Sequence, residues 1–343
     1  MGKVNNVMRH YVSNKRRFAD LFNGVFFQGN NVIRADELTE ASEQYTELAA
    51  ENAGTLEAGE RLERIRDIKM NLKSGEGLRI LAVENQNHVD YSMPFRCMEY
   101  DSMEYRKQIE ELKQENRAKA GLRTMAEKFC GLKGNDRLKP VYTLCLYHGI
   151  EKWDGPRCLK DMMEFGEDPD RMSRFFADYP LRLFCVNENA DFAVFHTELR
   201  EVFEALRFRR DKKGFRQIIE TNPAYGHLDR DTVEVLSVLM QAPGIWEERE
   251  KYMNHNNENE EEYDMITAWQ ELLMDERAEG RSEGRSEGRL EGRSEGRMEG
   301  IQVLIEICRE FGKSYEETKR QVAEKFGLDE KNAQNGMNKY WKE

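Results

Sequence analysis

Residues 78–96 read LRILAVENQNHVDYSMPFR, and this stretch contains an apolar strand with an unusual end. The run before Glu84 is rich in strand-forming residues and predicts a buried strand. It stops abruptly at Glu84, Asn85 and Gln86, one carboxylate and two amides that a buried strand normally avoids. Either the strand reaches solvent at this point, or the three polar residues belong to a functional site.

The preceding residues predict that this strand is half of a β-hairpin. Residues 63–73 alternate between apolar and polar, and a Ser-Gly-Glu-Gly turn follows at 74–77. With the turn centred between residues 75 and 76, Asp67 stands directly opposite Glu84, with Cβ atoms about 4.5–5.5 Å apart. Gln86 shares the face of Glu84, because side chains alternate along a strand. A one-residue bulge would separate the carboxylate pair.

Two adjacent carboxylates repel each other, so the pair predicts a cation between them. Mg²⁺ prefers oxygen ligands, often one or two carboxylates completed by water and substrate phosphate. Such an ion polarises a phosphodiester and activates a water molecule. The spacing therefore predicts that Asp67 and Glu84 hold Mg²⁺ or another divalent metal.

The composition predicts a soluble, cytoplasmic protein without a membrane segment. The chain has 343 residues, of which 39% are hydrophobic and 34% are charged. No stretch approaches the roughly 20 apolar residues of a membrane span, and the first residues lack the apolar core of a secretory signal. Six cysteines without a C-x-x-C pair indicate reduced thiols rather than a zinc site. The net charge of −12 argues against general polyanion binding but leaves a local basic groove open.

The order of patterns predicts a mixed α/β domain followed by helices and a repeat. Helices are expected at 13–27, at 91–119 from about Pro94, and at 157–165; further strands are expected at 140–148 and 181–186. Strands separated by helices favour a mixed sheet flanked by helices. The predicted organisation is an α/β domain over 1–190, a helical region over 191–250, an acidic linker and helix over 251–278, a Glu-Gly-Arg repeat over 279–300, and C-terminal helices over 301–343.

Several stretches together resemble one protein family. Asp, a hairpin and then Glu-x-Gln is similar to the core of the PD-(D/E)XK nucleases, in which the last position is usually Lys. More specifically, the chain resembles the recombination-promoting nuclease (Rpn) family, whose members are often labelled putative transposases. The resembling stretches are RFADLFNGVFF (17–27), ERIRDIKM (63–70), AVENQNHVDYSMPFRCMEYDSMEY (82–105), PVYTLCLYHGIEKWDGP (140–156) and DYPLRLF (178–184), and the repeat tail also fits.

The resemblance implies a PD-(D/E)XK-like fold and a metal-dependent DNA endonuclease linked to mobile elements or recombination. Asp67 and Glu84 would be the metal ligands, and Gln86 would occupy the place of the usual Lys. Gln is a neutral amide and cannot supply the positive charge with which Lys steadies an attacking hydroxide, so the strength of the site is open. Asp20, on the helix at 13–27, could add a metal ligand or be a solvated helix carboxylate.

Further residues are candidates for contacts with DNA. Arg96, Tyr100 and Tyr105 follow the strand at helical spacing and could hold phosphates or simply pack. The segment RFRRDKKGFR could neutralise DNA phosphates, although a charge run is more often a solvated face. Its candidate residues are Arg207, Arg209, Arg210, Lys212, Lys213 and Arg216. His88 is interpreted as structural, and the strand end at 147–149 is assigned no chemistry.

The repeat AEGRSEGRSEGRLEGRSEGRMEG carries no catalytic constellation. Gly costs about 1 kcal/mol in a helix relative to Ala, so a helix here is weak alone. Glu and Arg on neighbouring turns are expected to pair. Two interpretations stay open, a flexible or semi-helical spacer and a self-association arm that makes the protein a homo-oligomer.

The preferred function is Mg²⁺-dependent endonucleolytic hydrolysis of DNA. The alternative is a nucleic-acid-binding or scaffold protein with a weak or inactive site, which self-associates through its tail. The neutral Gln86 is consistent with either. A strand-transferring transposase is disfavoured, because no third acidic residue stands at a suitable spacing.

Overall fold

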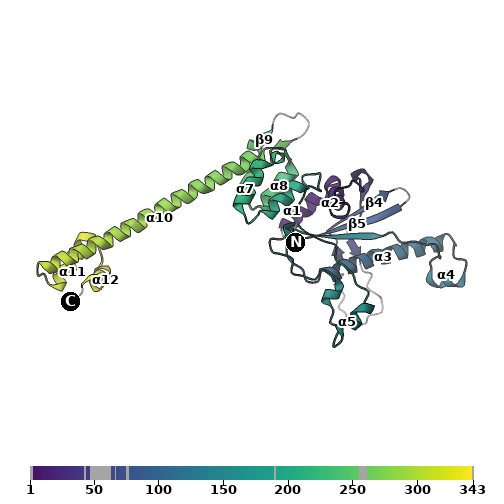
Figure 1. Cartoon of the computed structure of the whole chain (residues 1–343), viewed down its shortest axis with the longest axis horizontal. Coiled ribbons are helices and arrows are strands. Elements are labelled where there is room, and N and C mark those ends of the chain that lie inside the picture. Colours follow the sequence, from purple (N-terminus) through teal and green to yellow (C-terminus); the bar gives the residue numbers. More distant parts are fainter. Residues whose placement is uncertain are drawn as a thin grey trace. The chain divides into compact units, whose positions relative to one another are not determined.

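The chain contains a mixed five-stranded sheet flanked by helices (Figure 1). The computed structural model describes residues 3–41, 44–46, 63–65, 67–74, 77–188, 191–254 and 261–341. Met1–Trp269 and Gln270–Glu343 form two compact units. The mixed α/β class expected from the sequence is confirmed.

The central sheet has the strand order β1-β4-β5-β6-β7. β4 (Ile68–Ser74) and β5 (Gly77–Gln86) form the predicted hairpin, and β1 (Leu38–Glu40) pairs antiparallel with β4. β6 (Val141–Tyr147) runs parallel to β5, and β7 (Leu183–Cys185) runs parallel to β6. The carboxyl ends of β5 and β6 therefore meet at one edge of the sheet.

The hairpin has the register expected from the sequence. Ile68 pairs with Val83, and the pairing continues without a bulge to Ser74 and Gly77. Asp67 and Glu84 are the next positions outward, and Asp67 lies at a bend directly before β4. Residues 63–65, expected as part of the same strand, instead form β3 (Glu63–Ile65), which pairs with β2 (Gln44–Thr46). The turn residues 75 and 76 lie outside the described part of the chain.

Helix α3 (Met93–Ala118) covers the face of the sheet that carries Glu84, and it is the long helix expected to begin near Pro94. Pro94 stands in the first turn, where its missing N–H removes no helical hydrogen bond. Buried residues of α3, β6 and β7 form an apolar cluster between helix and sheet. Its members are Met93, Cys97, Cys145, Tyr147, Trp153, Leu181 and Cys185.

Helices α1 (Lys3–Ser13) and α2 (Lys15–Phe27) lie on the other side of the sheet. Figure 1 shows α2 and α3 on opposite sides of β4 and β5. Asn14 is the N-cap of α2, and its side chain accepts the N–H groups of Arg16 and Arg17. The apolar face of β4 is buried on this side, as its alternation predicts.

The helical region expected at 191–250 belongs to the same compact unit as the sheet. It contains α6 (Leu199–Arg207), α7 (Lys212–Thr221), α8 (Arg230–Leu239) and α9 (Pro243–Glu247). Arg17 of α2 is buried, forms ion pairs with Asp229 and with Asp231, and lies 4.0 Å from the ring centre of Tyr11. This guanidinium connects α2 to the start of α8, within the one compact unit that holds both.

Two local predictions are wrong. The helix expected at 157–165 is only a 3₁₀ turn, Leu159–Met162; two further short helices, α4 (Met125–Cys130) and α5 (Pro169–Met172), were not expected. The residues flanking the acidic stretch are not an exposed linker, because β9 (Met253–Asn254) and β10 (Glu262–Tyr263) pair and join β8 (Leu228–Asp229). Tyr252 and Tyr263 are buried. The burial of their rings stabilises this packed arrangement, although most of the residues around them are polar. Residues 255–260 lie outside the described residues.

The repeat lies within one helix, α10 (Met265–Glu310), followed by α11 (Tyr315–Phe326) and α12 (Glu330–Tyr340). The end of α10 packs with α11 and α12 around Ile301, Ile305, Val322 and Met337. Ser314 and Glu317 form a capping box that starts α11. Two helices follow the repeat as predicted, but residues 301–310 continue α10. Among the described helices, none is long and apolar enough to cross a membrane.

The ion pair between Lys69 of β4 and Glu104 of α3 offers a test of this packing. Its Nζ to Oε2 distance is 2.5 Å, and the two side chains are 3% and 5% exposed. Lys69→Met leaves a buried carboxylate without its cation and should lower the free energy of unfolding by about 3–5 kcal/mol. The double variant Lys69→Met/Glu104→Leu should recover most of this loss. Chemical denaturation measures both, and a single variant as stable as the wild type would contradict the buried pair.

Candidate active site

The polar end of β5 lies at the sheet edge where β5 and β6 both finish. Glu84 is 1% exposed and Asp67 is 4% exposed, so both carboxylates are buried. Oδ2 of Asp67 accepts the backbone N–H of Asn85 at 2.7 Å, and the backbone carbonyl of Asp67 accepts Nε–H of Arg9 at 2.5 Å. These contacts hold Asp67 against the strand residue that follows Glu84.

The three polar residues that end β5 point to different sides of the sheet. Glu84 and Gln86 share the face covered by α3, while Asn85 projects to the other face and donates to the carbonyl of Asn5 in α1 at 3.1 Å. Gln86 is partly exposed and lines an open pocket of about 660 Å³ with residues 87–92 and Asn5. The buried Glu84 therefore lies on the same face of β5 as Gln86, which lines this polar pocket.

Glu84 forms an ion pair with Arg96 of α3. Nη2 of Arg96 lies 3.9 Å from Oε2 of Glu84, and its Nη1 lies 2.5 Å from Oδ2 of Asp90. Asp90 in turn accepts the backbone N–H and the hydroxyl of Ser92, at 2.8 and 2.6 Å. Burial acts to lower the pKa of Arg96, but Asp90, Tyr100 and Glu84 together raise it. The guanidinium is thus held in its charged form beside the candidate carboxylates.

The donor set suits a hard divalent cation. Burial raises the pKa of the Asp67 carboxyl, and the Asn85 N–H, Arg9 and Arg96 offset this only in part. A bound cation would favour the ionised form of Asp67. Among the described residues, no group of three or more His, Cys, Asp or Glu side chains is placed to hold a metal. Asp67 and Glu84 would therefore hold a metal as two carboxylates, with water and phosphate completing its shell.

The carboxylate of Asp20, suggested by the sequence as a further metal ligand, is engaged at residues 196–197. Its two carboxylate oxygens accept the backbone N–H groups of His196 and Thr197 and the hydroxyl of Thr197, at 2.7–3.0 Å. Asp20 thereby anchors the segment that leads into α6. Helical spacing alone could not show this, because the partners lie far away in the sequence.

The two tyrosines of α3 pack rather than face solvent. Tyr100 is 7% exposed and hydrogen-bonds with Arg96. The hydroxyl of Tyr105 accepts the backbone N–H of Val141 at 3.2 Å and so ties α3 to the start of β6. Tyr100 is therefore a positioning residue for Arg96, and it is not placed to contact DNA directly.

The basic segment is partly neutralised by acidic neighbours. Arg210 forms an ion pair with Glu151, and Arg216 forms one with Glu220 at 2.6 Å. Arg207 and Lys213 are exposed, and the side chain of Lys212 lies outside the described residues. Only part of this segment is therefore available for the phosphate contacts that its charge suggested.

A buried histidine, His148, and a half-buried arginine, Arg209, meet at the end of β6, where the sequence indicated no chemistry. Within the part of the chain that the structure describes, neither ring nitrogen of His148 has a hydrogen-bond partner, and burial lowers the pKa of its imidazole to about 3. Nη2 of Arg209 donates to the His148 carbonyl at 3.3 Å, and burial lowers the Arg209 pKa to about 10. No described carboxylate forms an ion pair with Arg209. The sequence signal was the strand end at Tyr147, but only the fold brings Arg209 to it.

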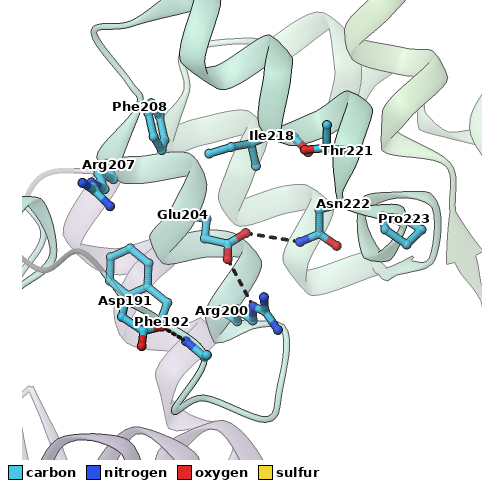
Figure 2. Close-up of a pocket in the computed structure, with 11 residues that line it drawn as sticks. Asp191, Phe192, Arg200, Glu204, Arg207, Phe208, Ile218, Thr221, Asn222 and Pro223 are labelled. Carbon is cyan, nitrogen blue, oxygen red and sulfur yellow. Dashed lines mark hydrogen bonds and ion pairs between the residues drawn. The ribbon is translucent and has the colours of Figure 1, made fainter.

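A separate pocket of about 500 Å³ lies among α6, α7 and residues 191–193 (Figure 2). Glu204 occupies its wall, where it pairs with Arg200 at 3.1 Å and accepts from Asn222 at 3.2 Å. Phe192, Phe208 and Ile218 supply apolar lining, and Arg207 lies beside them (Figure 2). The pocket contains none of the residues at the carboxyl end of β5, so it is not part of the candidate active site.

Comparisons of this chain with family models, with curated proteins and with solved structures find no match. The likeness to the recombination-promoting nucleases therefore stays a prediction, and the site has to be judged on its own geometry.

Replacing Asp67 by Asn should raise stability while removing a metal ligand. Because burial raises the Asp67 pKa, protonation of this carboxyl favours the folded state, and that contribution is lost as the pH rises through the folded pKa. Asp67→Asn should therefore raise Tm at neutral pH by about 2–4 °C, the shift expected for ~1 kcal/mol, and the gain should disappear as the pH falls towards about 4.

The matched control is Asp101→Asn, because Asp101 is another buried aspartate between α3 and the sheet. Asp101 accepts the hydroxyls of Thr143 and Tyr179, each at 2.6 Å, so its replacement should lower Tm. Thermal unfolding between pH 4 and pH 8 measures both variants. A drop in Tm for both would show that the Asp67 carboxylate stabilises the fold.

Proposed function

We propose that this chain is a metal-dependent nuclease that hydrolyses phosphodiester bonds of DNA, with Asp67 and Glu84 as its metal-holding residues. The observation that carries the proposal is the register of β4 and β5, which brings these two buried carboxylates to adjacent positions at an open sheet edge. Burying two like charges side by side is unfavourable unless a cation accompanies them.

The fold is consistent with this proposal. An acidic residue before a hairpin, followed by a second acidic residue on the central strand of a mixed sheet, is the arrangement expected of a PD-(D/E)XK-like core. On the same resemblance we assign the activity to an endonuclease that acts in recombination or on mobile elements, in the cytoplasm. DNA is the proposed substrate, and Mg²⁺ is the proposed cofactor.

Each polar residue of the edge has a defined task in the proposed reaction. A divalent metal would supply charge for the phosphate and acidify a water molecule. Asp67 and Glu84 would hold it, and the Gln86 amide, which lines the opening, would orient the attacking water. Arg96 supplies the fixed positive charge that Gln86 lacks, since Asp90 and Tyr100 hold its guanidinium near Glu84.

Arg209 is the best-placed residue of the basic segment to meet the DNA backbone. Its charge lies at the carboxyl end of β6, next to the end of β5, and no described carboxylate pairs with it. A phosphate there would compensate a charge that burial disfavours. Arg210 and Arg216 already have acidic partners and would contribute less.

Cleavage of supercoiled plasmid tests the proposal directly. Purified protein should nick plasmid with Mg²⁺ or Mn²⁺ and not with EDTA. Asp67→Ala and Glu84→Ala should each lower the rate by at least about 10³-fold, because each removes half of the metal-holding pair. Circular dichroism establishes that both variants are folded.

The outcomes separate the nuclease from its alternative. Activity that survives both substitutions would place the chemistry elsewhere or in a contaminant. No cleavage by the wild type, with DNA binding retained, would favour a nucleic-acid-binding protein with an inactive site. The contact of Arg96 with Glu84 favours this second candidate in part, because a guanidinium already balances that carboxylate.

Substitution of Arg96 should affect cleavage and metal binding in opposite directions. Arg96→Gln should lower the cleavage rate by about 10²–10³-fold through the loss of a fixed charge. It should tighten Mn²⁺ binding, because it removes a cation that competes for Glu84. Calorimetric titration with Mn²⁺ measures the affinity, and Arg157→Gln, which breaks an exposed pair with Glu188, serves as control. Weaker Mn²⁺ binding by Arg96→Gln would show that Arg96 supports the site only structurally.

A further inference from the structure

Residues 284–296 of α10, in the middle of the repeat, have almost no packing neighbours. Residues 284–299 of α10 are exposed, and a Cβ added at Gly284, Gly288, Gly292 or Gly296 would meet no atom within 4 Å. A helix that gains nothing from packing depends on propensity and on pairs along its own surface. Gly at every fourth residue costs about 1 kcal/mol each relative to Ala.

The charge pattern of this segment cannot stabilise the helix from within. Neighbours on a helix surface lie three or four residues apart, and here each charged residue has a residue of the same charge four positions away, as in Glu287 with Glu291 or Arg289 with Arg293. The separation in sequence between a Glu and an Arg of the repeat is always two or six residues or more, and never three or four. A Glu and an Arg are therefore never neighbours on the helix surface. Among residues 284–300 the structure accordingly contains no Glu–Arg ion pair, and the expectation of pairing between neighbouring turns is wrong. Each like pair instead costs a few tenths of a kcal/mol.

The same pattern is complementary to a second copy of itself. At about 100° per residue, the Arg positions follow one line along the helix and the Glu positions follow another, on roughly opposite sides. The Gly line and the line formed by Ser286, Leu290, Ser294 and Met298 lie between them. Whichever of these two lines faces a partner, it has Arg along one flank and Glu along the other.

We propose that α10 pairs in parallel with α10 of a second copy of this chain through a contact that lies within residues 284–299. Two parallel copies related by a twofold axis along the helices place the Arg flank of each beside the Glu flank of the other. An antiparallel pair would place Arg beside Arg and Glu beside Glu. Charge therefore selects both the partner and its direction, and the like-charge repulsion within each helix is offset between the helices.

The repeat length also limits the contact. Four residues turn the helix by about 400°, so each line drifts by about 40° per repeat relative to the helix axis. A period above 3.6 residues favours a right-handed crossing, and the contact spans only about two repeats before the lines turn away. The association should accordingly be moderate in strength and sensitive to salt, as exposed ion pairs are.

Charge inversion of the full-length protein tests the proposal. One variant changes Arg285, Arg289 and Arg293 to Glu, and the other changes Glu287, Glu291 and Glu295 to Arg. Sedimentation equilibrium should find the wild type dimeric, each variant alone monomeric, and an equimolar mixture of the two dimeric again. High salt should dissociate the wild-type dimer.

Each other result overturns the pairing. A monomeric wild type at about 100 µM removes the interface, and two variants that remain dimeric alone place the interface elsewhere. A mixture that stays monomeric, although thermal unfolding shows both variants folded, excludes pairing by charge complementarity.

The direction of the pair has its own measurement. A nitroxide at Gln302→Cys, with the exposed Cys130 and partly exposed Cys158 replaced by Ser, reports the distance between the two copies. Parallel helices hold the labels within about 25 Å. An antiparallel pair centred on Gly292 separates them by about 30 Å along the axis alone, at 1.5 Å per residue. The longer distance would overturn the parallel arrangement.

Discussion

The charges buried between the central sheet and α3 are the constraint on which the rest of the sheet unit depends. Asp67, Lys69 and Glu84 all lie on the α3 side of the sheet, where apolar side chains would normally pack. Each buried charge needs a partner, and α3 supplies Glu104 for Lys69 and Arg96 for Glu84. These two pairs help to fix the position and direction of α3 on the sheet.

This arrangement connects stability with the proposed chemistry. A core made only of apolar residues would be simpler to stabilise, but it could not hold a cation or a phosphate. The free-energy cost of a buried charge is largest at Asp67. Burial disfavours its ionised form, and the Asn85 N–H, Arg9 and Arg96 compensate only in part. A site of this kind keeps a carboxylate that would gain from a metal. The apolar cluster around Tyr147 and Trp153 packs beside it, between α3 and the sheet.

The charges of the C-terminal repeat are arranged differently from those of the sheet unit. The sheet unit satisfies its charges inside one chain, whereas residues 284–296 of the repeat are exposed and form no Glu–Arg pair among themselves. Its period of four residues keeps like charges adjacent on a helix and opposite charges apart. A second copy resolves that conflict without any apolar core, which suits an association that responds to salt.

The sequence by itself determined the hairpin, its register and the neighbourhood of Asp67 and Glu84, because a period-two pattern and a short turn are local properties. It also located α3, since Pro94 and the apolar residues after it are adjacent in the chain. Only the tertiary structure decided that Asp20 anchors residues 196–197, that Arg209 lies on His148, and that residues 63–65 leave the hairpin strand to pair with 44–46. These contacts join segments distant in sequence, and their partners are selected by burial and hydrogen bonding in three dimensions, which no local pattern encodes.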